Sequence, residues 1–536
     1  MPNRLGSNRG MRILRKIADR WLRGRAAKPH AASSSVGQEA AHAEFALDVT
    51  VPAQLEADGA SVGGLAAVQV LPHLAHKHGI VLRPGTSLAT PTIRSDAPPT
   101  LRLSMACAPG TGPAVVHVER RSEPGGSRVR LASFTVDGRS ANEWVFELAT
   151  NGTGDDGCHR YWLTAAGDNP GPVVITGMLL GEAHRLGRLH AFASYAHCLK
   201  NEVQNFSGAA YTHRMYGESA GSTASRGVAA ATSGGSPLAA RDRAAELAAR
   251  VASRVDAMPP QPGEVAFQYA MRLLGAVLPM QPPDFLNRAN LLGGEGTLRI
   301  LSLCAGAARI EELILKHSRR PIRMTLLDAS RDLIERAAGR LAEVDPRHSI
   351  DCLVGDVNDG LPGDAQFDVV VCVSALHHVA DLERVLADVN GRLDGVGEFW
   401  SIGEQIGRNG NRLWPDTLSA ANRAFARLPA SLRRNRRTGE IDATLSDQDF
   451  SIGCFEGIRS QELEGMLEAH FIPVDLFKRN CFLWRIVDMT YADNFDLAKA
   501  DDAAWLRHLV AAEAAHWACG GRATELHGIY RKKTVQ

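Results

Sequence analysis

Four short segments in the second half of the chain carry residues suited to binding a nucleoside or moving a proton. The run Cys304–Ala308, CAGAA, has small side chains that let backbone N–H groups approach a ligand closely. Asp328 is suited to accept hydrogen bonds from ribose hydroxyls, and Asp356 from an adenine amino group. His377 and His378 titrate near neutral pH, so they are candidate general bases.

Each of these segments follows a stretch that reads as a buried strand. From about residue 262, apolar β-branched runs alternate with stretches of helical periodicity. The strand candidates are LRILSL, MTLLDAS, DCLVGDV, FDVVVCVSAL and GEFWSIGE. Repeated βαβ units of this kind predict a Rossmann-like α/β fold with a doubly wound parallel sheet. In such sheets, ligands bind outside the carboxyl ends of the strands, where the four segments lie.

The order and spacing of these segments resemble a class I S-adenosylmethionine (SAM)-dependent methyltransferase over roughly residues 262–490. The resemblance implies SAM as the cofactor. It also implies a set of cofactor-binding residues, namely Ser302, Cys304, Ala305, Gly306, Asp328, Ala329, Asp356, Val357 and Ser374. The chain departs from the family pattern in the first loop, where the family has an acid in place of Ser302 and more glycines than Gly306.

A narrower resemblance covers EQIGRNGNRLWPDTLSAANRAFARLPASLR and CFEGIRSQELEGMLEAHF. These segments are similar to a bacterial branch whose members occur with surface-polysaccharide and glycan-modifying genes. In that branch the segment from Glu404 to about Asn411 closes over the active site. The resemblance places Glu404, Arg412 and Arg459 on the acceptor side and makes Glu404 a third candidate base. Salt bridges or helix caps are the alternative interpretation of each.

The region 46–182 has the two-residue periodicity of β-strands. Leu101, Leu103 and Met105 alternate with polar residues, and further strand candidates are 114–119, 128–136, 160–165 and 173–180, separated by turn sequences. This pattern predicts an all-β sandwich, which resembles jelly-roll modules that bind carbohydrate. Trp144, Tyr161 and Trp162 are candidates for stacking on a sugar ring. Packing in the core is the alternative.

The remaining segments complete the expected domain organisation. Residues 1–30 hold nine Lys or Arg against one acid, and residues 11–25 form a basic amphipathic pattern. Three interpretations of this pattern stay open: contact with an anionic membrane surface, a helix docked on the protein itself, and an unstructured terminus. Residues 183–260 read as a helix plus a low-complexity linker, and residues 262–536 as the methyltransferase domain with a C-terminal extension.

Composition excludes several classes of partner. The net charge is +1, which gives no electrostatic sign of nucleic-acid binding. The nine cysteines lack a CxxC pair, so we expect reduced thiols, a cytoplasmic setting, and neither a disulfide framework nor a metal site. No apolar run reaches the length needed to span a bilayer, so any membrane contact is expected to be peripheral.

Three functions are compatible with these features. The first is a methyltransferase acting on a glycan or a glycosylated lipid intermediate. The second is a small-metabolite methyltransferase with a structural β-sandwich. The third is a non-catalytic SAM-fold binding module, which the shortage of glycines in the first loop favours. The acceptor, the atom methylated and the oligomeric state do not follow from the sequence.

Overall fold

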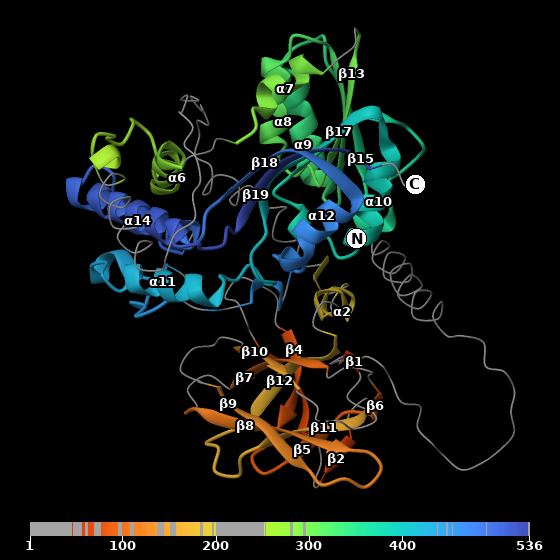
Figure 1. Cartoon of the computed structure of the whole chain (residues 1–536), viewed down its shortest axis with the longest axis vertical. Helices are drawn as coiled ribbons and strands as arrows, with labels where there is room; N and C mark the ends of the chain where they lie inside the picture. Colours follow the sequence, from red (N-terminus) through yellow and green to blue (C-terminus); the bar gives the residue numbers. More distant parts are fainter. Residues whose placement is uncertain are drawn as a thin grey trace, which may run out of the picture.

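The chain folds into a β-sandwich and an α/β domain (Figure 1). The computed structural model describes residues 45–46, 56–58, 63–68, 77–94, 99–107, 112–136, 144–150, 157–182, 186–193, 195, 198–199, 251, 253–278, 282–292 and 296–533, the last range without 437, 446, 448, 453 and 489. The helix predicted in residues 1–30 and most of the linker predicted in residues 183–260 lie outside the described residues.

The sandwich consists of two antiparallel sheets, which confirms the expected all-β architecture. The first sheet contains β1 (Phe45–Ala46), β3 (Gly63–Val68), β4 (Lys77–Leu82), β7 (Thr100–Cys107), β10 (Trp144–Ala149) and β12 (Val173–Gly181). The second contains β2 (Glu56–Asp58), β5 (Ser87–Ala89), β6 (Ile93–Arg94), β8 (Ala114–Ser122), β9 (Val129–Val136) and β11 (Cys158–Ala165). Leu101, Leu103 and Met105 are fully buried between the sheets, as their alternation predicts.

The α/β domain is built on a seven-stranded sheet with the order β15-β14-β13-β16-β17-β19-β18. The strands are β13 (Leu298–Leu303), β14 (Ile322–Asp328), β15 (Ser349–Val354), β16 (Phe367–Val373), β17 (Leu393–Gln405), β18 (Phe471–Arg479) and β19 (Glu525–Lys532). The first five are parallel, whereas β19 is antiparallel to both of its neighbours. The α/β fold class is confirmed, and the sheet is mixed because the C-terminal extension adds this edge.

Helices cover both faces of this sheet and form a separate layer beside it (Figure 1). One face packs on α7 (Phe285–Leu291), α8 (Arg309–His317) and α9 (Arg331–Ala342), and the other on α10 (Leu382–Arg392) and α12 (Leu463–His470). The separate layer contains α6 (Ala266–Val277), α11 (Pro415–Phe425), α13 (Leu483–Ile486) and α14 (Ala500–Ala518). Short 3-10 turns are η3 (Val357–Asp359), η4 (Leu376–His378), η5 (Ala430–Arg433), η6 (Phe450–Ile452), η7 (Ser460–Glu462) and η8 (Ala492–Asn494).

The strand order reverses between β13 and β16, because β13 pairs with β14 on one side and β16 on the other. At such a switch point the strand-to-helix connections leave in opposite directions and open a crevice at the carboxyl edge. The site residues predicted from the sequence follow these strands. None of the described helices has both the length and the apolar character required to cross a membrane.

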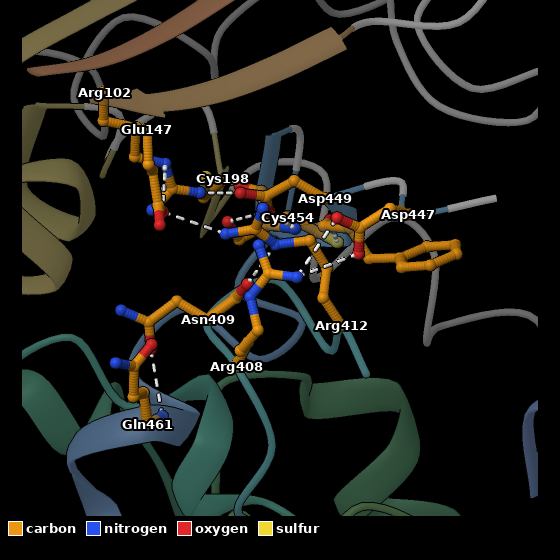
Figure 2. Close-up of polar contacts among 12 residues, drawn as sticks. Arg102, Glu147, Cys198, Arg408, Asn409, Arg412, Asp447, Asp449, Cys454 and Gln461 are labelled. Carbon is orange, nitrogen blue, oxygen red and sulfur yellow. Dashed lines mark hydrogen bonds and ion pairs between the residues drawn. The ribbon is translucent and has the colours of Figure 1, made fainter. Parts of the chain in front are cut away.

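A buried ion-pair network joins the sandwich to the α/β domain (Figure 2). Arg102 on β7 pairs with Asp449, and Arg412 Nη2 donates a hydrogen bond of 3.0 Å to Glu147 on β10. The side chains of Arg102, Arg412 and Asp449 are almost fully buried. Burial raises the pKa of Glu147, but the charges of Arg412 and Arg102 outweigh it and lower that pKa below its ordinary value. Arg412 therefore serves the domain contact, which corrects its expected place on the acceptor side.

Replacing Asp449 tests this network. Asp449→Asn is expected to lower the free energy of unfolding by about 3 kcal/mol, because it leaves the buried guanidinium of Arg102 without its nearest negative charge. The matched control is Asp351→Asn, which breaks an exposed pair with Arg323 and should cost less than about 1 kcal/mol. Urea denaturation followed by circular dichroism measures both variants, and equal losses would contradict a structural role for the network.

Candidate functional site at the carboxyl edge of the sheet

The turn between β13 and α8 has a left-handed backbone at alternate residues. The φ angles of Cys304, Gly306 and Ala308 are 48°, 51° and 49°. An L-residue in this conformation costs about 1–2 kcal/mol, so two of the three positions carry strain that glycine would not. The loop stays open, because a Cβ on Gly306 would meet nothing closer than the Cys304 carbonyl oxygen at 3.9 Å. The loop thus has a left-handed backbone at three positions, although only one of them is a glycine. Ala305, within the loop, is buried.

Asp328, at the end of β14, lies against this loop. Its Oδ2 accepts a hydrogen bond from Gly306 N at 2.8 Å, and its Oδ1 accepts one from Ser330 N at 2.7 Å. Both carboxylate oxygens thus accept from backbone N–H groups, one in the loop and one after β14. Ala329 is exposed at the same edge. The structure therefore brings together the first two predicted cofactor-binding segments.

Ser302 lies within the fold and not in the loop. It is fully buried, and its hydroxyl donates a hydrogen bond of 2.7 Å to Oε1 of Glu311, which is also buried in the first turn of α8. This corrects the expectation that the Ser302 side chain binds the cofactor. Burial raises the pKa of Glu311.

Asp356, after β15, already has protein donors. Its Oδ1 accepts from Asn358 N at 2.9 Å and from Asn358 Nδ2 at 3.0 Å, while its Oδ2 accepts from the hydroxyl of Tyr195. Burial and the Asp356 carboxylate raise the pKa of Tyr195, so its phenol stays protonated and remains a donor. A ligand amino group that donates to Asp356 must share the carboxylate with Tyr195, which follows α2 (Leu186–Ala193). Val357 is buried beneath this turn and can offer only its backbone.

The turn after β16 is held by a buried carboxylate. Oε1 of Glu404 accepts from Ala375 N at 2.8 Å and Leu376 N at 3.0 Å. Its Oε2 accepts from His377 N at 3.2 Å and lies 3.0 Å from His377 Nδ1. Ser374, which starts the turn, is left-handed with a φ of 48° and donates its N–H to the Ile402 carbonyl at 2.8 Å.

A local irregularity in β17 aims Glu404 at this turn. The pairing of β17 with β19 shifts register between Ser401 and Glu404, and Gly403 between them has a φ of 69°. A β-bulge of this kind redirects the next side chain. Because both Glu404 oxygens are buried and accept hydrogen bonds, the geometry does not support the predicted role of general base. It makes Glu404 a positioning residue for His377.

The structure also shows the surroundings of His378, a candidate base, and of Arg459, a candidate acceptor-side residue. His378 is partly exposed, and its Nε2 lies 3.5 Å from Oε2 of Glu456, a residue that the sequence patterns did not single out. Arg459 is fully buried and bound to Glu383 and Glu462. Although burial opposes it, the hydrogen bonds that Arg459 donates to these acids raise its pKa. This corrects the expectation that Arg459 faces the acceptor, since it joins α10 to the turn before α12.

Comparison with known proteins identifies the class of this domain. Residues 301–398 match the family described as a methyltransferase domain, and this range spans all four predicted segments. The C-terminal half of the chain therefore contains a class I SAM-dependent methyltransferase domain. No curated protein matches the sequence.

The solved structures that are similar to this chain include two methyltransferases and a cyclase. A SAM-dependent methyltransferase from Thiobacillus denitrificans, in complex with S-adenosyl-L-homocysteine, is 18% identical and covers 46% of this chain and 90% of its own, with a TM-score of 0.26. The glycopeptide N-methyltransferase MtfA, in complex with sinefungin, is 15% identical with a TM-score of 0.25 and covers 47% and 86%. The [4+2]-cyclase SpnF is 14% identical with a TM-score of 0.27 and covers 58% and 100%.

Substitutions at two glycines test the role of the loop between β13 and α8. Gly306 and Gly363 both have positive φ and room for a side chain, but Gly363 precedes β16 and so lies at the opposite edge of the sheet. Gly306→Val and Gly363→Val should each lower stability by at least about 1–2 kcal/mol, because a branched residue is disfavoured in this conformation. Calorimetric titration with S-adenosylhomocysteine should show at least about tenfold weaker binding for Gly306→Val alone, a loss of about 1.4 kcal/mol. Equal effects of both variants on binding would contradict the assignment of this loop.

Proposed function

We propose that this chain transfers the methyl group of SAM to an acceptor held at the carboxyl edge of the seven-stranded sheet. The observation that carries the proposal is the ordered series of ligand-suited groups at successive strand ends. These groups are the loop 304–308, Asp328, Asp356 and the turn 374–378, and all lie within the matched range 301–398.

The residues of this edge fit a nucleoside-containing cofactor. The loop 304–308 has small side chains and a left-handed backbone that lets a ligand approach closely. Asp328 would accept the ribose hydroxyls, and Asp356 the adenine amino group. When bound, SAM supplies a methyl group on a positively charged sulfur, which an acceptor displaces in line. The protein's task is to hold the acceptor on that line, and the rigid turn 374–378 is placed to do so.

A ligand-binding comparison of two Asp→Asn variants tests the cofactor assignment. SAM and S-adenosylhomocysteine should raise the melting temperature of the wild type, since a ligand at a hundredfold its Kd adds about 2.7 kcal/mol. Asp328→Asn should lose this shift, because the side-chain amide of asparagine has only one acceptor oxygen. Asp351→Asn, on the exposed pair with Arg323, should keep it.

Two outcomes would contradict the assignment. If neither ligand stabilises the wild type at millimolar concentration, the chain is a non-catalytic module with the methyltransferase fold. If Asp328→Asn keeps the full shift, the ribose hydroxyls bind elsewhere.

For the acceptor, the proposal is a glycan or a glycosylated lipid intermediate. The resemblance of residues 404–433 and 454–471 to a polysaccharide-associated branch supports it. The basic pattern of residues 11–25, if bound to an anionic membrane, would bring the enzyme near lipid-linked material. One observation favours the second candidate, a small metabolite with a structural sandwich. Tyr161 is fully buried, and the guanidinium carbon of Arg128 lies 4.3 Å from the ring centre of Trp162. Neither ring offers the open face that sugar stacking requires.

Transfer of radiolabel separates the two candidates. The full-length protein is incubated with SAM labelled in the methyl group and either a lipid-linked glycan fraction or a low-molecular-weight metabolite extract. The proposal expects label in the glycan fraction and its release with the sugar after mild acid hydrolysis. Label confined to the metabolite extract would reject the glycan acceptor and leave the methyltransferase assignment intact.

A further inference from the structure

The geometry points to a divalent transition-metal site formed by His377, His378 and Glu456. Each residue offers one ligand atom, and the three atoms lie within 4.8 Å of one another. The two histidines belong to η4 at the carboxyl end of β16, and Glu456 comes from the loop after η6. The site therefore lies at the edge of the sheet where the acceptor is expected. It revises the prediction from the sequence, which contained no metal site.

The separations fit shared coordination better than direct hydrogen bonds. His377 Nε2 lies 3.8 Å from Oε1 of Glu456, and His378 Nε2 lies 3.5 Å from its Oε2. Hydrogen bonds between nitrogen and oxygen lie at about 2.7–3.2 Å, so both distances are too long. Two ligand atoms bound to one tetrahedral metal, each at about 2.0–2.1 Å, are about 3.3 Å apart. The three ligand atoms lie within 4.8 Å of one another, so movements of up to about 1.5 Å would bring them to that spacing.

Glu404 prepares His377 for this role. An ionised carboxylate only accepts hydrogen bonds, so the 3.0 Å contact with Glu404 requires the proton of His377 on Nδ1. The Nε2 atom then faces Glu456 with either a second proton or a lone pair. A carboxylate behind a metal-bound histidine is the usual arrangement in protein metal sites, because it fixes the tautomer and makes the imidazole a stronger ligand.

The third ligand, Glu456, is also held in place by hydrogen bonds. Asn411 Nδ2 donates to Oε1 of Glu456 at 2.7 Å. On one side of Glu456, Gly457 accepts from Gly410 N at 2.7 Å, and Ile458 N donates to the His377 carbonyl at 3.1 Å. The glutamate loop is thus bonded to the turn that carries the histidines. This preorganisation is what a metal site needs from its surroundings.

Two imidazole nitrogens and one carboxylate select Zn²⁺ or a neighbouring first-row ion over Mg²⁺ or Ca²⁺, which prefer oxygen ligands. Three protein ligands leave an open coordination position, as in catalytic zinc sites. The opening lies toward His378 and Glu456, whose side chains are 16% and 25% exposed, whereas His377 is 3% exposed. A metal there would bind an acceptor oxygen and lower the pKa of a bound hydroxyl. It would replace the general-base role predicted for the two histidines, because a lone pair that binds a cation cannot accept a proton.

Metal binding to the purified full-length protein tests this site without any assay of activity. The protein is stripped with a chelator and titrated with Co²⁺, whose visible absorption reports its ligands, and Zn²⁺ is then added as a competitor. The expected result is equimolar Co²⁺ binding that Zn²⁺ displaces. His378→Gln and Glu456→Gln should abolish the Co²⁺ spectrum, and Glu404→Gln should weaken binding by about 10–100-fold. His317→Gln, at an exposed position on α8, should bind like the wild type.

Circular dichroism checks that the variants are folded, and X-ray absorption of the Zn²⁺-bound wild type reports the ligands without any variant. That spectrum should show two imidazoles and no sulfur. The proposal is overturned if the wild type binds no metal saturably, if the folded His378→Gln and Glu456→Gln proteins bind like His317→Gln, or if sulfur ligands appear. None of these results bears on the SAM site, which the two Asp→Asn variants test separately.

Discussion

The candidate site depends on one buried carboxylate, that of Glu404. A buried charge is costly unless hydrogen bonds satisfy it, and here three backbone N–H groups and an imidazole do so. The same contacts fix the turn after β16, because its N–H groups would otherwise lack partners. The bulge at Gly403, where β17 pairs with β19, aims the side chain. The antiparallel strand β19 thus contributes to the site through its pairing with β17.

The sandwich and the site are connected by the segment between Asn409 and Arg459. Arg412 binds Glu147 of the sandwich, and Asp449 binds Arg102. Asn411, next to Arg412 in the chain, donates a hydrogen bond to Glu456. Tyr195, just after the sandwich, reaches Asp356 on the cofactor side. Contacts from the sandwich region therefore reach both halves of the candidate site, which gives the sandwich a structural role even if it binds no ligand of its own.

The sequence predicted the parts of this structure that local patterns control. Alternation placed the sandwich strands 114–122, 129–136 and 158–165 to within a few residues, and continuous apolar runs located β13 to β17. The order of strands then put Asp328 and His377 at one edge. Residues recruited from elsewhere could not be predicted in this way. Glu311 binds Ser302 from the next helix, and Glu456 approaches the histidines through tertiary contacts that no periodicity encodes. For Arg412 and Arg459 the sequence leaves two interpretations open, the acceptor side and a salt bridge, and in the structure both pair with acids on distant elements.

We propose that four strand ends of the α/β domain form one cofactor site. Hydrogen–deuterium exchange of the full-length protein, with and without saturating S-adenosylhomocysteine, is the most direct test. A shared site would slow exchange in segments 304–308, 328–330, 356–358 and 374–378 together and leave the sandwich strands unchanged. Protection confined to the sandwich, or to only one of the four segments, would contradict it.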